Sequence, residues 1–254
     1  FTISTGKFHN YPIGKNNLPI NQVLDICLDG EYLWIATENG GLSRLHTKSN
    51  TFTTFNYDKY DPNSVVSNSI WSLHLDKQGR LWIGSYARGL CLLDPFDMKF
   101  KEIDLSISTD LINAIIEDRR GRLWLGTEDG VIQVDGDRVK HFKHNPTDPN
   151  SLSNKAVNCI LEDSRGQIWF GLWNGGINRY DENKGGFIRY LPDTSRSGSL
   201  SNPNVFYIME HSQTGELYVC TFGGLFILKD QRAGVFENYV DLALESSQLL
   251  LTAH

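Results

Sequence analysis

The sequence predicts an all-β fold built from repeated four-stranded antiparallel sheets, and three observations lead to this prediction. A motif of the form Asp-x-x-Gly-x-Leu-Trp-Ile-Gly recurs along the 254 residues. Short apolar runs alternate with turns rich in glycine, aspartate and asparagine, as in hairpins. No stretch outside the last residues shows the 3.6-residue periodicity of an amphipathic helix.

The motif recurs at the interval expected of propeller blades. Clear copies occupy residues 76–84, 118–127 and 163–171, a shortened copy occupies 29–37 and a drifted copy occupies 213–221. Their anchor aromatics are Trp34, Trp82, Trp124, Trp169 and Tyr218, at spacings of 48, 42, 45 and 49 residues. Propeller repeats of four strands have this period. We therefore expect one β-propeller domain over 1–254, with complete blades at 22–57, 69–104, 111–143, 156–191 and 204–240.

The fourth repeat shows how each blade divides into strands. We expect its four strands at 156–163, 167–172, 176–181 and 187–190, with a tight turn at 164–166 between the first two. The continuous apolar run Ile168-Trp169-Phe170 suits a strand buried on both faces between neighbouring blades. Gly84, Gly126 and Gly171 recur inside the second strand, and close approach of the adjacent blade is the expected reason.

The two ends of the chain together predict a further blade. Residues 1–12 read as its third and fourth strands, and residues 241–254 as its first and second strands, although 241–251 also contain a leucine-rich stretch with a helical alternative. Sharing one blade between the termini removes exposed sheet edges. The prediction is therefore about six blades, five complete and one shared. A fragment of a larger propeller, or of a tandem pair, remains the alternative, since the chain begins in mid-pattern.

Charge and hydrophobicity exclude some classes of binding partner. The net charge is −6 and no basic stripe occurs, so nucleic acid is not an expected partner. No apolar run is long enough to span a bilayer, so we expect no direct membrane insertion by this segment. Cys27, Cys91, Cys159 and Cys220 lie singly in apolar runs without a C-x-x-C pair, and are expected to pack as small buried hydrophobes.

The loops between the second and third strands hold the candidate ligand site. In propellers these loops and the inter-blade connections lie on one face, and here they differ from blade to blade while the strands repeat. A binding site of aromatic side chains with a few polar groups is the ordinary form of a small-molecule site. The alternative is that these are turn residues only. The candidate residues are Glu38, Asn39, Tyr86, Arg88, Glu128, Asp129, Trp173, Asn174 and Phe222.

Catalytic and metal-binding motifs are missing from the sequence. The seven histidines form no H-E-x-x-H or Cys/His cluster, and no G-x-S-x-G, P-loop or dinucleotide fingerprint occurs. The Asp-Pro-Asn-Ser linkers at 61–64 and 148–151 lack the alternating carboxylates of a calcium loop and suit self-capped turns. The recurrent Trp anchors are expected in the core. We predict no catalytic residues, no metal and no cofactor.

The motif and the linkers together resemble the two-component regulator propeller repeat. Asp-x-x-Gly-x-Leu-Trp-Ile-Gly-Thr is followed by Gly-Gly-Leu or Gly-Gly-Ile, and Asp-Pro-Asn-Ser recurs in register with it. The resemblance implies a periplasmic sensor domain of a hybrid histidine kinase, a carbohydrate ligand such as an oligosaccharide, a homodimeric full-length receptor and a kinase outside this chain. Members usually have more blades, an immunoglobulin-like domain and a membrane helix, which this sequence does not show.

Two other functions stay open at this stage. Virginiamycin-type lyases are propellers with a similar Gly-x-Ile-Trp-Phe strand and depend on a histidine with a divalent metal; His144 is the best candidate here. A scaffold or dimerisation propeller is the third, and it would expose an apolar patch in place of a polar-lined pocket. The fold alone does not choose among the three.

Overall fold

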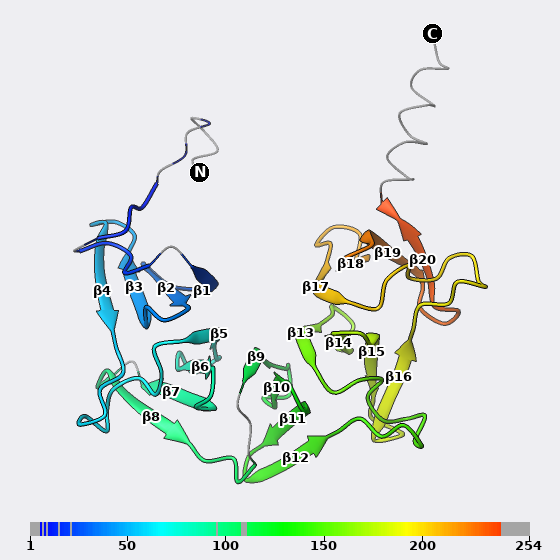
Figure 1. Cartoon of the computed structure of the whole chain (residues 1–254), viewed down its shortest axis with the longest axis horizontal. Helices are drawn as coiled ribbons and strands as arrows, with labels where there is room; N and C mark the ends of the chain where they lie inside the picture. The colour runs from blue at the N-terminus through cyan, green and yellow to red at the C-terminus, as the bar shows by residue number, and fades with distance from the viewer. Residues whose placement is uncertain are drawn as a thin grey trace. The chain divides into compact units, whose positions relative to one another are not determined.

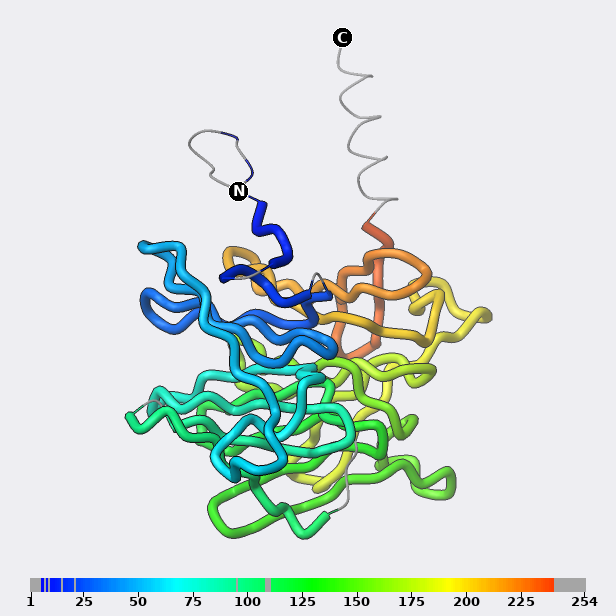
Figure 2. The backbone as a smooth tube through the Cα atoms, turned by 60° about the vertical axis from the view of Figure 1, so that its left-hand side comes forward, coloured from blue at the N-terminus to red at the C-terminus, as the bar shows by residue number. Residues whose placement is uncertain are grey.

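The computed structural model describes residues 6, 8, 10–14, 16–20, 22–94, 96–107 and 111–239. Its elements are twenty strands in five four-stranded antiparallel sheets, each sheet formed from four consecutive strands (Figure 1). This confirms the predicted all-β architecture of four-stranded propeller blades. Figure 2 shows the backbone meandering through one sheet before it enters the next.

The five sheets are numbered here as blades in chain order. Blade 1 holds β1 (Val23–Asp29), β2 (Tyr32–Thr37), β3 (Leu42–His46) and β4 (Thr51–Phe55). Blade 2 holds β5 (Ile70–Leu75), β6 (Leu81–Ser85), β7 (Leu90–Asp94) and β8 (Lys99–Ile103). Blade 3 holds β9 (Ile112–Glu117), β10 (Leu123–Thr127), β11 (Gly130–Asp135) and β12 (Arg138–Phe142).

Blades 4 and 5 complete the described strands. Blade 4 holds β13 (Val157–Glu162), β14 (Ile168–Leu172), β15 (Gly176–Asp181) and β16 (Gly186–Tyr190), which confirms the strands predicted for the fourth repeat. Blade 5 holds β17 (Val205–Glu210), β18 (Leu217–Thr221), β19 (Gly224–Asp230) and β20 (Val235–Asn238). By its internal contacts the chain divides into two compact units, Phe1–Ile112 and Asn113–His254.

The predicted shared blade lies largely outside the described residues. Residues 241–254 fall beyond them, and in 1–12 the described residues 6, 8 and 10–12 belong to no strand. The count of six blades therefore stays a prediction.

Each unit has an apolar core between consecutive sheets. In the first unit, Trp34, Leu42, Ile70 and Ile83 pack in one cluster that joins blades 1 and 2. In the second unit, one cluster contains Trp124, and another is formed around Trp169 and residues of blade 5. The continuous apolar runs of the second strands are buried because a sheet covers each of their faces.

The glycines inside the second strands allow neighbouring sheets to approach closely. A Cβ at Gly171 would lie 2.5 Å from Cys159 Sγ and 2.6 Å from Val205 Cγ1 of blade 5. At Gly126 it would lie 2.9 Å from Val157 Cγ1 of blade 4. These distances are too short for a side chain, so the steric explanation of the repeated glycine is confirmed at both positions.

Candidate functional site

In blades 2, 3 and 4 the recurring motif forms a hydrogen-bonded hairpin between the first and second strands. Asp118 Oδ1 accepts hydrogen bonds from the backbone N–H groups of Arg120 and Arg122 at 2.9 and 3.0 Å. Its Oδ2 accepts from Trp124 Nε1 at 2.8 Å and from Arg122 Nε at 2.7 Å. The aspartate therefore closes the turn and orients the buried indole.

The same arrangement recurs in blades 2 and 4. Trp82 Nε1 donates to Asp76 Oδ2, and Trp169 Nε1 donates to Asp163 Oδ2, both at 2.9 Å. All four Trp anchors are at most 8% exposed, which confirms their core role. The Asp–Trp hydrogen bond was not predicted from the sequence, although the six-residue separation of the two residues is the same in blades 2, 3 and 4.

The charges of Asp118 and Asp76 are stabilised by their hydrogen-bond donors. Burial alone would raise the pKa of Asp118, but the hydrogen bonds from Trp124 and Arg122 and the charge of Arg122 outweigh it, so the pKa is lowered. The pKa of Asp76 is lowered in the same way, with Arg80 and Trp82 as its donors. Asp76 and Asp118 therefore have a structural role at this end of their blades.

The loops between second and third strands have a shared turn and variable side chains. Asn39, Ala87 and Asn174 occupy the same loop position and have positive φ angles of 65°, 62° and 50°. Asparagine tolerates this conformation better than alanine does. The first residue of the loop is more variable, being Glu38, Tyr86, Glu128, Trp173 and Phe222 in blades 1 to 5.

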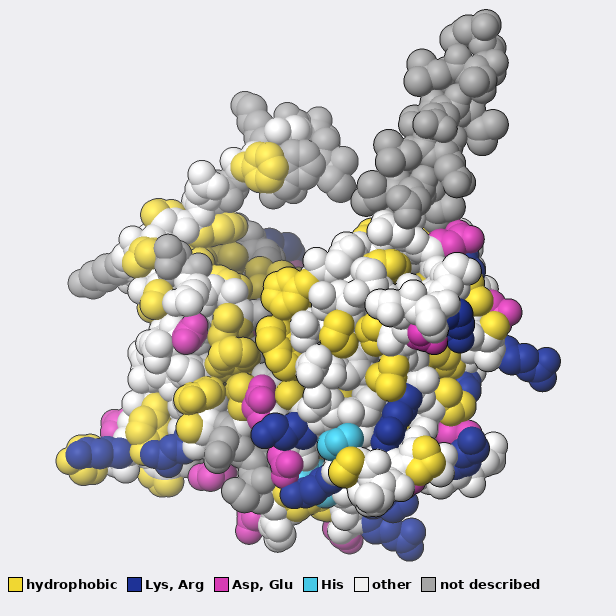
Figure 3. All heavy atoms as spheres, turned by 45° about the vertical axis from the view of Figure 1, so that its right-hand side comes forward, with side chains coloured by type: hydrophobic (Ala, Val, Ile, Leu, Met, Phe, Trp, Pro, Cys, Tyr) yellow, Lys and Arg dark blue, Asp and Glu magenta, His cyan; other side chains and the backbone are white. Residues whose placement is uncertain are grey.

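In the second unit the structure brings two predicted residues together. The ring centroids of Trp173 and Phe222 lie 5.8 Å apart, and Phe206 lies 6.1 Å from the first and 4.4 Å from the second. The exposed fractions are 47% for Trp173, 40% for Phe206 and 64% for Phe222. We call these three residues the aromatic cluster. Figure 3 shows that hydrophobic side chains are exposed at several places on one face of the molecule.

Phe206, the third member of the aromatic cluster, was not among the residues predicted from the sequence. The register of β17 and β18 shifts between Val205 and Tyr207, so that Phe206 is the residue without a partner across the ladder. A β-bulge re-aims a side chain in this way. A bulge is not visible in the sequence, because it depends on how the two strands pair.

Asn174 has a defined place beside the aromatic cluster. Its backbone N–H donates to Asn204 Oδ1 at 2.8 Å, and its carbonyl accepts from Asn154 Nδ2 at 3.2 Å. Both partners come from inter-blade connections. The loop is therefore fixed by its backbone groups, while its side chains are left at the surface beside Trp173.

Glu128 and Asp129 have protein partners within the second unit. Asn113 Nδ2 donates to Glu128 Oε1 at 3.3 Å, and Lys143 Nζ lies 2.6 Å from Asp129 Oδ2. Asp129 also holds His141, whose Nε2 lies 2.8 Å from the Asp129 carbonyl. These exposed contacts are weak and leave both carboxylates accessible to solvent.

The predicted residues of the first unit form three local groups. Asn39 exchanges hydrogen bonds with Ser69 Oγ, at 3.2 Å from its N–H and 2.9 Å to its Oδ1, next to Glu38. Tyr86 is 54% exposed and its ring lies 6.4 Å from that of Trp71. Arg88 lies over the Tyr57 ring, 5.1 Å from its centroid. None of these groups includes a second predicted aromatic residue.

The expected structural roles of the linkers and cysteines are observed. Asn63 and Asn150 each donate a backbone N–H to the aspartate two residues earlier, Asp61 and Asp148, at 2.9 Å. The four cysteines are free and buried or half-buried. Burial raises the pKa of Cys91 to about 11 and that of Cys159 to about 12, so both remain protonated thiols.

The proposed lyase histidine has a structural contact. His144 Nδ1 lies 2.7 Å from the Leu152 carbonyl, in the connection before blade 4. Among the described residues, no three side chains of His, Cys, Asp and Glu gather as metal ligands would. The described part of the chain also contains no helical segment with the length and hydropathy that a membrane crossing requires.

The class of protein is thus a β-propeller domain with variable loops at one end of its blades, and a family model matches three of its repeats. A family model described as "Two component regulator propeller" matches residues 64–87, 106–129 and 151–174. Each match runs from an inter-blade connection to the loop after the second strand. The chain therefore carries two component regulator propeller repeats, as the sequence motif predicted.

Solved structures share the fold at low sequence identity. One, described as the extracellular domain of a hybrid two component system from B. thetaiotaomicron, is 23% identical with a TM-score of 0.61, and the match covers 91% of this chain and 35% of that one. Virginiamycin B lyase from Staphylococcus aureus is 16% identical with a TM-score of 0.64, covering 85% and 69%. The comparison with curated proteins found no match.

A third structure widens the range of functions found on this fold. An auxiliary nutrient binding protein from Bacteroides ovatus is 9% identical with a TM-score of 0.57, and the match covers 86% of this chain and 57% of that one. The extracellular domain of a two component system, a lyase and a nutrient binding protein thus share the architecture. The function of this chain must be argued from its own surface.

Proposed function

We propose that this chain is a non-catalytic, ligand-binding portion of an extracytoplasmic two-component sensor, and that its ligand is an oligosaccharide. The regulator propeller repeats support the sensor class. The extracellular domain with the same fold is consistent with a location outside the cytoplasm. The chain spans about a third of that structure's length, so the kinase partner and receptor dimerisation also belong to this proposal.

The aromatic cluster is the observation that carries the ligand assignment. Trp173 and Phe222 come from equivalent loops of two consecutive blades, and Phe206 joins them from the start of β17. Aromatic rings have a large apolar face, and their exposure to water is unfavourable unless a partner covers them. The faces of sugar rings are apolar while their rims carry hydroxyls, so a saccharide can stack on the rings and hydrogen-bond to an adjacent amide such as Asn174.

Calorimetric titration with a panel of oligosaccharides tests this proposal. The variants Trp173→Ala and Phe222→Ala should weaken binding of a recognised oligosaccharide at least about tenfold, since each removes about 1.4 kcal/mol or more of contact energy. Phe96→Ala is the matched control, because Phe96 is 92% exposed in a different loop and should bind as the wild type does. Unchanged binding in both cluster variants would place the ligand elsewhere.

The lyase alternative is tested by turnover. If the chain degrades virginiamycin B in the presence of a divalent metal, and His144→Ala abolishes the reaction, the non-catalytic proposal is wrong. No turnover, with sugar binding intact, leaves the sensor proposal standing. Analytical ultracentrifugation of the same sample tests the scaffold alternative, which requires self-association without a ligand.

A further inference from the structure

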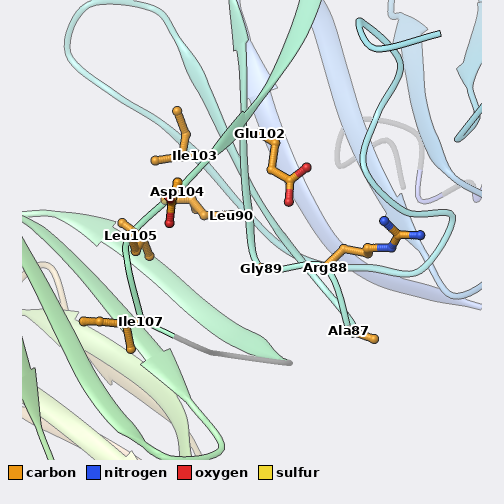
Figure 4. Close-up of a pocket in the computed structure, with 9 residues that line it drawn as sticks. All are labelled: Ala87, Arg88, Gly89, Leu90, Glu102, Ile103, Asp104, Leu105 and Ile107. Atoms are coloured by element: carbon orange, nitrogen blue, oxygen red, sulfur yellow. The ribbon is translucent and has the colours of Figure 1, made fainter. Parts of the chain in front are cut away.

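The first unit contains a cavity beside blade 2, and none of its lining residues belongs to the aromatic cluster. Its volume is about 580 Å³, within the range of small-molecule sites. The loop between β6 and β7 forms one part of it, and the end of β8 with the following connection forms the other (Figure 4). The lining residues are Ala87, Arg88, Gly89, Leu90, Glu102, Ile103, Asp104, Leu105 and Ile107.

The connection beside this cavity is shorter than the other inter-blade connections. Residues 104–111 join blades 2 and 3, whereas the connections at 56–69, 143–156 and 191–204 contain 14 residues each. The longer connections share a turn in which a serine hydroxyl accepts a backbone N–H six residues earlier. The described part of 104–111 contains no such turn, and fewer residues are present there to fill the space next to the sheet.

The loop of blade 2 also differs from its equivalents at one position. Arg88 stands where blades 1 and 4 have Gly40 and Gly175. A Cβ at Gly40 would lie 2.6 Å from Ile20 Cγ2, and one at Gly175 would lie 2.9 Å from Asn154 Cβ. A side chain is therefore excluded in those two blades. Blade 2 accommodates an arginine, and its preceding residue, Ala87, has a φ of 62° that alanine rarely adopts.

The charged groups of the cavity are predominantly acidic. Glu102 lies on β8 and Asp104 directly follows the end of this strand, and both residues line the cavity. Asp104 Oδ1 accepts the Ser106 N–H at 2.7 Å, which leaves its Oδ2 for a ligand. Within the described residues neither carboxylate forms an ion pair.

The positively charged residue of the lining, Arg88, contacts a tyrosine that does not line the cavity. The Arg88 guanidinium lies over the Tyr57 ring, and its Nη2 lies 3.4 Å from the Tyr57 hydroxyl. The base of the cavity is apolar, since Leu90 and Leu105 are 1% and 7% exposed. With Arg88 stacked on Tyr57, the two carboxylates and the apolar base favour a ligand with a positive charge and a less polar body.

We propose that this cavity is a second ligand site, which takes a small hydroxylated organic cation of the size of an amino sugar. The ammonium group lies against Glu102 and Asp104, and the less polar face of the ligand packs on Leu105 and Ile107. The site is independent of the aromatic cluster, and it stands whether or not the chain binds an oligosaccharide there. A carboxylate-bearing ligand of the same size is excluded by charge repulsion.

Three sugars that differ in charge test the proposal on the whole chain. Calorimetric titration with D-glucosamine should give binding, D-glucose should bind at least about tenfold more weakly, and D-glucuronate should not bind. Glu102→Gln and Asp104→Asn should each reduce glucosamine affinity at least about tenfold, toward that of glucose. Asp137→Asn, a change at an exposed aspartate in the β11–β12 turn, is the matched control and should have no effect.

Two outcomes would overturn the proposal. One is equal affinity for glucosamine and glucose, or no binding of either. The other is glucosamine binding that survives both carboxylate variants while a thermal melt shows the variants folded. Trp173→Ala separates the two sites, because it should leave glucosamine binding unchanged even where it abolishes oligosaccharide binding.

Discussion

The two ends of the blades are built on different principles. At the turn between the first and second strands, Asp76, Asp118 and Asp163 repeat the same hydrogen bonds to a tryptophan indole. At the loop between the second and third strands, the backbone turn recurs at Asn39 and Asn174, but the side chains around it change from blade to blade. Repetition at one end serves the fold, and variation at the other leaves the surface free to bind different chemistry.

The largest expected effect on stability distinguishes two tryptophans that are four residues apart, Trp169 and Trp173. It would sharpen the comparison between the two ends of the blades. Trp169→Ala should lower the free energy of unfolding by about 3 to 5 kcal/mol, because the side chain is fully buried and its hydrogen bond to Asp163 is lost. Trp173→Ala, at a residue 47% exposed, should change stability by no more than about 0.5 kcal/mol. Urea unfolding measures both, and similar losses would erase the distinction between the two ends.

A second prediction concerns Gly171, whose lack of a side chain allows the neighbouring sheet to approach closely. Gly171→Ala should destabilise the chain by about 1 to 3 kcal/mol, since the added methyl meets Cys159 Sγ and Val205 Cγ1. Gly30→Asn is the control, because Gly30 has a φ of 57° that asparagine tolerates and no atom within 4 Å of its would-be Cβ. A neutral Gly171→Ala would mean that the sheets separate without cost.

The contribution of Asp118 to stability is expected to depend on pH. Its pKa is lowered in the folded chain, so its contribution is complete above the unfolded pKa near 3.8 and is lost as the pH falls through the folded value. Asp118→Asn should therefore cost about 1 to 3 kcal/mol at pH 7 and less at pH 3. Urea unfolding of both proteins at the two pH values measures the difference; a cost independent of pH would show that the charge of Asp118 is not what matters.

The smallest expected effect concerns Asp25 on β1. Its pH dependence of stability is opposite to that of Asp118. Burial raises the pKa of Asp25 despite hydrogen bonds from the N–H groups of Leu73 and Ile26. Its contribution is complete below the unfolded pKa and is lost as the pH rises through the folded value. Asp25→Asn should consequently be better tolerated at pH 7 than at pH 3. Thermal melts at the two pH values would contradict this if the variant lost more stability at pH 7.

Much of the fold was predictable because the repeat is local. The turn, the aspartate and the tryptophan of blade 4 lie within 163–171, and the strands around them follow in order, so their spacing alone indicated a hairpin. The candidate site was predictable only in part. Trp173 and Phe222 were predicted as loop aromatics, whereas the position of Phe206 depended on a bulge in the ladder. Glu102 and Asp104 gave no signal, because one lies in an ordinary outer strand and the other directly after it.

The amino-acid sequence by itself determined the strand order, the blade period and the buried tryptophans, because these follow from contacts between residues close in the chain. Only the tertiary structure decided which apolar residues are covered. Ile26 and Leu73 occupy the same position in the first strands of blades 1 and 2, yet they are 59% and 7% exposed. Burial depends on the sheet packed against a residue, and the packing of one blade on the next is a contact between segments distant in sequence.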